Sequence, residues 1–220
     1  MAEAVRVVEV AEPPAPSLIK CLIAELIGTF FLLLTVLFSP PEIIVFTVGI
    51  VLMILVIALG NVSGTHINPA VTIGAMVIGA ISFGKGIAYM VAQVAGAFLA
   101  VLVQQSLAGG AWPSITPTVP ANAFIFELIG ALLLVFIIIR VVVSGFNPAA
   151  LGLAIGGALT VAVAISGAQS GAVLNPALGL ALLTGNIQAG EPANFLAYLV
   201  APLLGGAIGA LLGKFLAPSS

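Results

Sequence analysis

The sequence predicts an all-α integral membrane protein, with six transmembrane helices and two re-entrant half-helices that form an inverted repeat. Hydrophobic residues make up 62% of the 220 residues and charged residues only 5%, whereas a soluble domain carries about a quarter charged residues. Apolar segments long enough to cross a bilayer recur along the chain, and motifs of the first half return in the second. A chain this apolar needs lipid as its solvent.

The composition also excludes several classes of function. The net charge of −2 offers no basic patch for nucleic acid. One cysteine, Cys21, excludes an internal disulfide and a cysteine-based metal site, and one histidine, His66, excludes a histidine cluster. Aspartate is absent, so paired-aspartate chemistry is excluded as well. We therefore expect no catalytic centre, no cofactor, no metal and no nucleic-acid partner; the protein is not expected to be an enzyme.

Segments of about 20 apolar residues predict the spans. They lie at about Leu18–Phe38, Ile43–Gly60, Gly86–Leu107, Asn122–Val143, Ala149–Ser166 and Asn194–Leu216. Two further apolar stretches, Asn68–Ile78 and Asn175–Thr184, are too short to cross, and each begins with Asn-Pro. Short apolar segments of this kind indicate re-entrant half-helices.

The cations predict the orientation. With the N-terminus inside, all five fall on the inner side: Arg6, Lys20, Lys85, Arg140 and Lys214. Residues 1–17, which lack the apolar core of a cleaved signal, then form a cytoplasmic tail before a membrane domain over 18–216. Both termini are expected in the cytoplasm, and the plasma membrane is the expected location. The outer connection 108–121 carries Trp112, interpreted as an anchor at the membrane interface.

An internal duplication relates the two halves, at about 18–107 and 122–216. The segment Val62–Ala70 resembles Gln169–Ala177, and Glu25–Gly28 returns as Glu127–Gly130. Each half holds three spans, and an odd number makes the second copy enter the membrane from the opposite face. Inverted repeats place a shared site near the bilayer midplane, between broken helices.

The paired motifs Asn68-Pro69-Ala70 and Asn175-Pro176-Ala177 suit such a site. Asparagine caps a helix N-terminus, and proline fits its first turn. Alanine keeps the meeting point small, so that the asparagine amides can face a pore as donors. Two helix N-termini at mid-depth repel cations and favour neutral molecules. The pattern predicts a passive channel for water or other small uncharged solutes; Asn147-Pro148-Ala149 is interpreted as a chance match that opens the fifth span.

Three polar groups are expected to support this arrangement. Glu25 and Glu127 occupy matched repeat positions and are expected to accept hydrogen bonds from the unwound backbone before each half-helix. A proton relay through the two glutamates is the alternative. His66 is expected to pack or to bond backbone on the cytoplasmic side, with pH sensing as its alternative.

These motifs resemble the aquaporin (major intrinsic protein) family over about residues 18–216. The resemblance is carried by Ala24–Thr29, Ser63–Thr72, Ala92–Gly96 and Asn175–Ala177. It implies a right-handed bundle of six spans and two half-helices, with the aquaporin-like fold. It also implies a homotetramer in the bilayer with one pore in each subunit.

The resemblance further implies a selectivity filter near the outer mouth, formed here by Val48, Val163, Ala172 and Leu178. Leu178 stands where the family typically has arginine, so we expect a wider, aliphatic constriction that disfavours strongly hydrated solutes. Water, ammonia, dissolved gases, small apolar neutrals and neutral metalloid acids remain candidate permeants. Cys21 lies away from this filter, so mercurial reagents are not expected to block it.

Two other functions share some of these features. A secondary transporter also uses inverted repeats and broken helices, although the sequence offers only the two glutamates for ion coupling. A membrane packing or adhesion protein with a closed pore is the third possibility.

Overall fold

Helices account for most of residues 15–218, the part of the chain that the computed structural model describes. In order they are α1 (Leu18–Phe38), α2 (Ile44–Ser63), α3 (Pro69–Val77), α4 (Phe83–Ala108), α5 (Pro120–Val143), α6 (Pro148–Ser170), α7 (Pro176–Ala189) and α8 (Ala201–Phe215), with a π-helical turn at Leu196–Val200 before α8. Within this part, six helices are long and apolar enough to cross a membrane. The predicted fold class is confirmed. The predicted tail lies largely outside the described residues.

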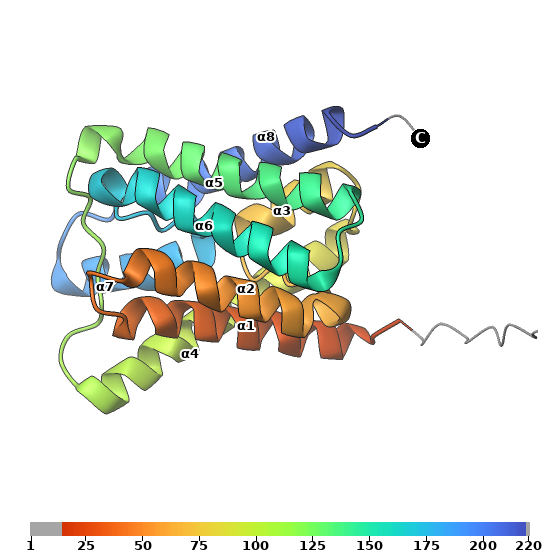
Figure 1. Cartoon of the computed structure of the whole chain (residues 1–220). Coiled ribbons are helices and arrows are strands. Elements are labelled where there is room, and N and C mark those ends of the chain that lie inside the picture. Colours follow the sequence, from red (N-terminus) through yellow and green to blue (C-terminus); the bar gives the residue numbers. More distant parts are fainter. Residues whose placement is uncertain (1–14, 219–220) are drawn as a thin grey trace, which may run out of the picture.

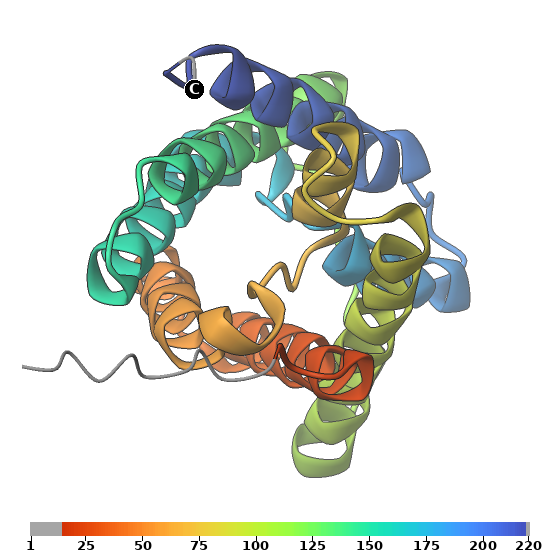
Figure 2. The same cartoon turned by 90° about the vertical axis from the view of Figure 1, so that its right-hand side faces the viewer.

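The long helices form a ring around a common axis, seen from the side in Figure 1 and along the axis in Figure 2. Helix α1 packs against α4, α5 against α8, and α2 against α6. The short helices α3 and α7 enter from opposite ends of the bundle (Figure 1). Both described chain ends lie at the end that α3 occupies.

Close approaches between helices repeat in the two halves. A Cβ on Gly96 of α4 would collide with the backbone carbonyl of Leu26 in α1, and a Cβ on Gly205 of α8 with that of Leu128 in α5. Glycine at these positions lets the helix backbones touch, which is a common way of packing helices in membranes. The α1–α4 and α5–α8 pairs therefore use the same contact, as an inverted repeat requires.

The described cations share one end of the bundle. Lys20 and Lys85 lie in the first turns of α1 and α4, and Arg140 and Lys214 in the last turns of α5 and α8. Lys214 Nζ donates to the carbonyl of Ile78 at 2.8 Å. This one-sided distribution is the asymmetry that the positive-inside rule describes.

Most bounds differ from the predicted ranges by up to four residues, and two further differences affect the second half-helix and the sixth span. Helix α7 continues to Ala189, beyond the predicted end at Thr184, and its 14 residues make it longer than the nine of α3. The sixth span opens with a π-helical turn, in which the Ala201 N–H donates to the carbonyl of Leu196. Pro202 follows directly, and proline has no N–H to continue the regular ladder of hydrogen bonds.

Candidate functional site: the central cavity

Asparagine caps both half-helices in the same way. Asn68 has an extended backbone, and its Oδ1 accepts from the Ala70 N–H at 2.8 Å. Asn175 Oδ1 accepts from the Ala177 N–H at 3.0 Å. In each case proline occupies the first helical turn, where a missing N–H removes no hydrogen bond. Both half-helices therefore begin with the same Asn-Pro cap.

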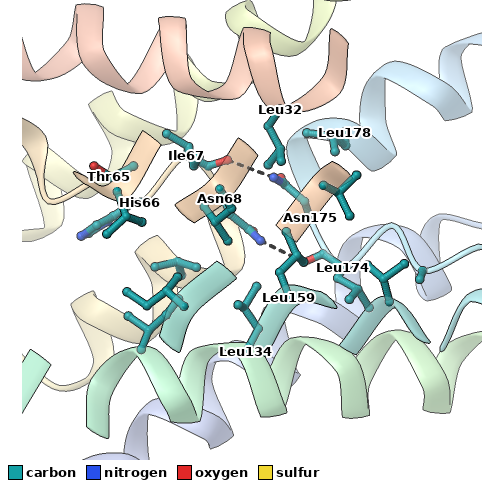
Figure 3. Close-up of a pocket in the computed structure, with 18 of the residues that line it drawn as sticks. Leu32, Thr65, His66, Ile67, Asn68, Leu134, Leu159, Leu174, Asn175 and Leu178 are labelled. Atoms are coloured by element: carbon teal, nitrogen blue, oxygen red, sulfur yellow. Dashed lines mark hydrogen bonds between the residues drawn. The ribbon is translucent and has the colours of Figure 1, made fainter. Parts of the chain in front are cut away.

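The two caps are joined to each other's loops. Asn68 Nδ2 donates to the carbonyl of Leu174 at 3.0 Å, and Asn175 Nδ2 donates to the carbonyl of Ile67 at 2.9 Å (Figure 3). A carboxamide nitrogen carries two N–H groups, so each asparagine keeps a second donor. Both asparagines line the central cavity, and this second donor is therefore available to a molecule inside it.

A buried carboxylate supports the loop before α3. Glu25 is fully buried. Its carboxylate accepts from Ser63 Oγ at 2.6 Å, from the His66 N–H at 2.9 Å and from the Ile67 N–H at 2.6 Å. Gln93 Nε2 adds a fourth hydrogen bond at 2.7 Å. A carboxylate offers about four acceptor positions, so this one is saturated.

Glu127 does the same for the loop before α7. It is fully buried and accepts from Ser170 Oγ at 2.7 Å, from the Val173 N–H at 2.9 Å and from the Leu174 N–H at 2.5 Å. Tyrosines brace the preceding turns: Tyr89 Oη donates to the carbonyl of Ser63 at 2.8 Å, and its repeat partner Tyr198 to that of Ser170 at 2.6 Å. The repeat thus extends to individual hydrogen bonds.

These contacts fix where the loop carbonyls point. In a trans peptide the N–H lies opposite the preceding carbonyl. Because the N–H groups of His66 and Ile67 face Glu25, the carbonyls of Thr65 and His66 face away from it, toward the cavity that both residues line. The carbonyls of Ala172 and Val173 face the cavity by the same argument.

Left-handed backbone conformations make these loops possible. Thr65 has φ +48°, Ile67 +42°, Ala172 +51° and Leu174 +53°. Such conformations cost roughly 1–3 kcal/mol each for residues other than glycine and persist only when surrounding contacts impose them. The buried glutamates and the crossed asparagine bonds are those contacts here.

The polar side chains around the first half-helix have no equivalent in the second half. His66 Nδ1 lies 3.2 Å from Thr72 Oγ1, which also accepts from Gln93 Nε2 at 2.9 Å. The matched positions of the second half hold Val173, Gly179 and Pro202. The half of the cavity around His66 is therefore the more polar one.

The central cavity has a volume of about 840 Å³. Backbone and amide groups of the two loops form its polar side, and aliphatic side chains of the surrounding helices form the rest, as Figure 3 shows for Leu134 and Leu159. Of the described residues, no charged side chain lines it, and His66 is its one titratable side chain. Val48, Val163, Ala172 and Leu178 all line it. The described residues contain no group of three or more His, Cys, Asp and Glu side chains that could hold a metal ion.

Several lining residues were not predicted from the sequence. Leu134 and Leu159 lie on α5 and α6 within long apolar runs, where nothing distinguishes the inward side chains from their neighbours. Ile115 of the connection between α4 and α5 also lines the cavity. Trp112, interpreted as an interface anchor, packs against Phe98, and its Nε1 donates to the carbonyl of Ala181 at 2.8 Å. Its indole attaches the connection to α7.

Two predicted features lie away from the cavity. Cys21 is buried in α1, and its Sγ donates to the carbonyl of Val62 at 3.1 Å; it is not among the lining residues. Asn147 caps α6 through a 3.0 Å bond from the Ala150 N–H and is exposed at the bundle end. The third Asn-Pro-Ala segment therefore only starts a helix.

Comparison with known proteins agrees with this geometry. Residues 12–212 match the model of the family described as "Major intrinsic protein". Aquaporin Z of Bradyrhizobium diazoefficiens is 30% identical over 225 residues, covering 88% of this chain and 91% of the relative. Aquaporin NIP1-4 of rice, Oryza sativa, is 32% identical over 163 residues, covering 67% of this chain but only 59% of the relative.

A solved structure shows the same fold. The X-ray structure of the aquaglyceroporin from Plasmodium falciparum superposes with a TM-score of 0.75 at 24% identity, covering 90% of this chain and 95% of that one. The structural likeness concerns the fold, and the family match, which spans most of the sequence, shows the family. The chain belongs to the major intrinsic protein family, whose aquaporin members are membrane channels and not enzymes.

Proposed function

We propose that this protein is a passive channel for water and small uncharged solutes, with the central cavity as the path. The observation that carries the proposal is the cavity itself, which extends past both Asn68 and Asn175 and is lined by no charged side chain of the described residues. A neutral molecule meets carbonyl acceptors and amide donors on one side and aliphatic groups on the other. An ion meets no charged side chain of the described residues and finds polar groups on only one side to replace its hydration, and losing that hydration is costly.

The half-helix termini add a barrier to cations. Helices α3 and α7 both begin at the asparagines, so the positive ends of their dipoles meet at mid-depth. Half-helix dipoles aimed at a pore are a known means of excluding protons and cations. Ion-coupled transport has little support, because the carboxylates of Glu25 and Glu127 are occupied by the loops of their own halves.

The outer part of the path forms an aliphatic filter in this proposal. Val48, Val163, Ala172 and Leu178 present no hydrogen-bonding side chain to a solute. A solute that sheds water there gains few polar partners in return. We therefore expect a preference for small solutes that carry little hydration, and water passes where the gap holds several molecules.

The assembly that we propose is a homotetramer in the plasma membrane with both termini in the cytoplasm. The described lysine and arginine side chains all lie at one end of the bundle, which supports the orientation. The family resemblance supports the tetramer with one pore per subunit. Chemical cross-linking in native membranes tests the tetramer, and a band no larger than the monomer contradicts it. Protease digestion of a tag at each terminus in sealed cells tests the orientation.

Stopped-flow light scattering on proteoliposomes tests the channel. We expect faster relaxation than in empty liposomes for water and for at least one of glycerol, urea and ammonia. Leu178→Arg should lower the passage of larger or less polar solutes, because it places a cation and donors in the aliphatic filter. Leu178→Met, which keeps the size and polarity, is the matched control. Identical permeability of both variants to every solute contradicts the filter, and native protein that conducts nothing contradicts the channel.

A further inference from the structure

We propose that Ile115 is a further specificity-determining residue of the path, placed in its outer mouth by the connection between α4 and α5. This inference rests on the proposed channel function. Of the connection Gly109–Val119, all of which the structure describes, Ile115 alone lines the central cavity. The contacts that hold the connection against the rest of the protein determine where the Ile115 side chain lies.

Three contacts attach the connection to the second half of the protein. Trp112 Nε1 donates to the carbonyl of Ala181 at 2.8 Å, and the backbone of Pro113 lies so close to Gly185 that a Cβ there would collide with it. At the other end, the Val119 N–H donates to the carbonyl of Gln169 at 3.0 Å. The connection is thus fixed on both sides of Ile115.

Ile115 also has an anchor of its own. Its N–H donates to Asn186 Oδ1 at 3.1 Å. Asn186 is almost fully buried and donates through Nδ2 to Glu191 Oε2 at 3.3 Å. A buried amide that is bonded through both of its ends has a fixed orientation, and it therefore fixes the backbone of Ile115.

The side chain of Ile115 occupies space that a glycine leaves open. A Cβ on Gly171 would lie 2.7 Å from Ile115 Cδ1, and Gly171 has φ +88°, where side chains are strained. Ile115 also packs against the buried cluster of Ala123, Leu183, Ala197 and Tyr198. Gly171 directly precedes Ala172 of the filter, so Ile115 lies against the same turn as the filter.

An aliphatic side chain held at this point has two physical effects. It narrows the mouth beside the filter, and it lengthens the section in which a solute finds no polar partner. Hydrophobic constrictions of this kind also favour dewetting. Ile115 therefore selects, together with the filter, against bulky and strongly hydrated solutes.

Thiol labelling tests the position. Ile115→Cys and Thr116→Cys are made in a Cys21→Ser background, labelled with a methanethiosulfonate reagent in detergent, quantified by mass spectrometry and reconstituted. Thr116 is the matched control because it is adjacent, exposed and not part of the cavity lining. We expect permeability of Ile115→Cys to fall in proportion to the labelled fraction, and that of Thr116→Cys to stay unchanged. Full labelling of Ile115→Cys without loss of flux, or failure of that residue to label, overturns the proposal.

Solute ratios test the selectivity. Ile115→Ala should raise the glycerol-to-water permeability ratio severalfold, and Ile115→Trp should lower it. Leu178→Arg is measured in the same series. If Leu178→Arg changes the ratios and neither Ile115 variant does, the inference on Ile115 fails while the channel stands. If the native protein conducts no better than empty liposomes, the proposed function itself fails.

Discussion

Replacing Glu127 by glutamine tests whether the buried carboxylate builds the loop before α7. The substitution keeps the size of the side chain and replaces one acceptor oxygen with an NH₂ group. The carboxylate accepts three hydrogen bonds, from Ser170 Oγ, the Val173 N–H and the Leu174 N–H. In Glu127→Gln at least one of these buried donors faces another donor, and the remaining bonds lose their charge.

The magnitude follows from those contacts. A buried donor left without an acceptor costs about 1–3 kcal/mol. Bonds to a charged group are worth about 1.5–3 kcal/mol and neutral ones about 0.5–1.5 kcal/mol, so each of the two remaining bonds weakens by roughly 1 kcal/mol. Glu127→Gln should therefore destabilise the protein by about 3–5 kcal/mol. Glu25→Gln should cost at least as much, because Gln93 Nε2 adds a fourth bond there.

Denaturant unfolding in detergent, followed by far-ultraviolet circular dichroism, measures the effect. Glu42→Gln is the matched control, since Glu42 is exposed in the turn between α1 and α2. The same chemical change there should alter the free energy of unfolding by no more than about 0.5 kcal/mol. If Glu127→Gln and Glu42→Gln unfold at the same denaturant concentration, the reasoning about the loop is refuted.

Two further substitutions probe packing and the cysteine. Gly96→Ala should lower the thermal midpoint, at a cost of about 1–3 kcal/mol, because the added Cβ meets the Leu26 backbone, whereas Gly157→Ala has nothing within 4 Å and should be neutral or stabilising. Equal midpoints would argue against the α1–α4 contact. Mercurial reagents should not block the native channel at its filter, because Cys21 is buried and not part of the cavity lining; rapid block in proteoliposomes that Cys21→Ser removes would contradict that placement.

The spans and half-helices were predictable because their signal is local. Hydropathy over about 20 residues marks a crossing, and an asparagine followed by proline marks a helix start. The first span was predicted with the bounds that the structure gives it, Leu18–Phe38. The duplication predicted that the half-helices meet, because matching motifs in an inverted repeat must face each other.

Contacts between distant segments were not predictable in the same way. Nothing near Asn68 in the sequence indicates that its amide donates to Leu174 rather than only into a pore. The polar residues Thr184, Asn186 and Gln188 suggest a helix end, yet α7 continues to Ala189, and Asn186 within it is bonded to Ile115 and Glu191. Ile115 itself carries no local signal, since its place depends on an anchor 71 residues later in the chain.

The central claim is that one continuous path passes beside the paired asparagines. Leu159→Trp tests it most directly, because Leu159 lines the cavity near Asn68 and Asn175 (Figure 3). Leu153→Trp is the control, on the same helix with a side chain that is 67% exposed on the bundle exterior. In proteoliposomes with equal amounts of folded protein, Leu159→Trp should abolish the permeability to water and to every solute that the native protein conducts, while Leu153→Trp conducts as the native protein does. Undiminished water permeability in folded Leu159→Trp would contradict the path.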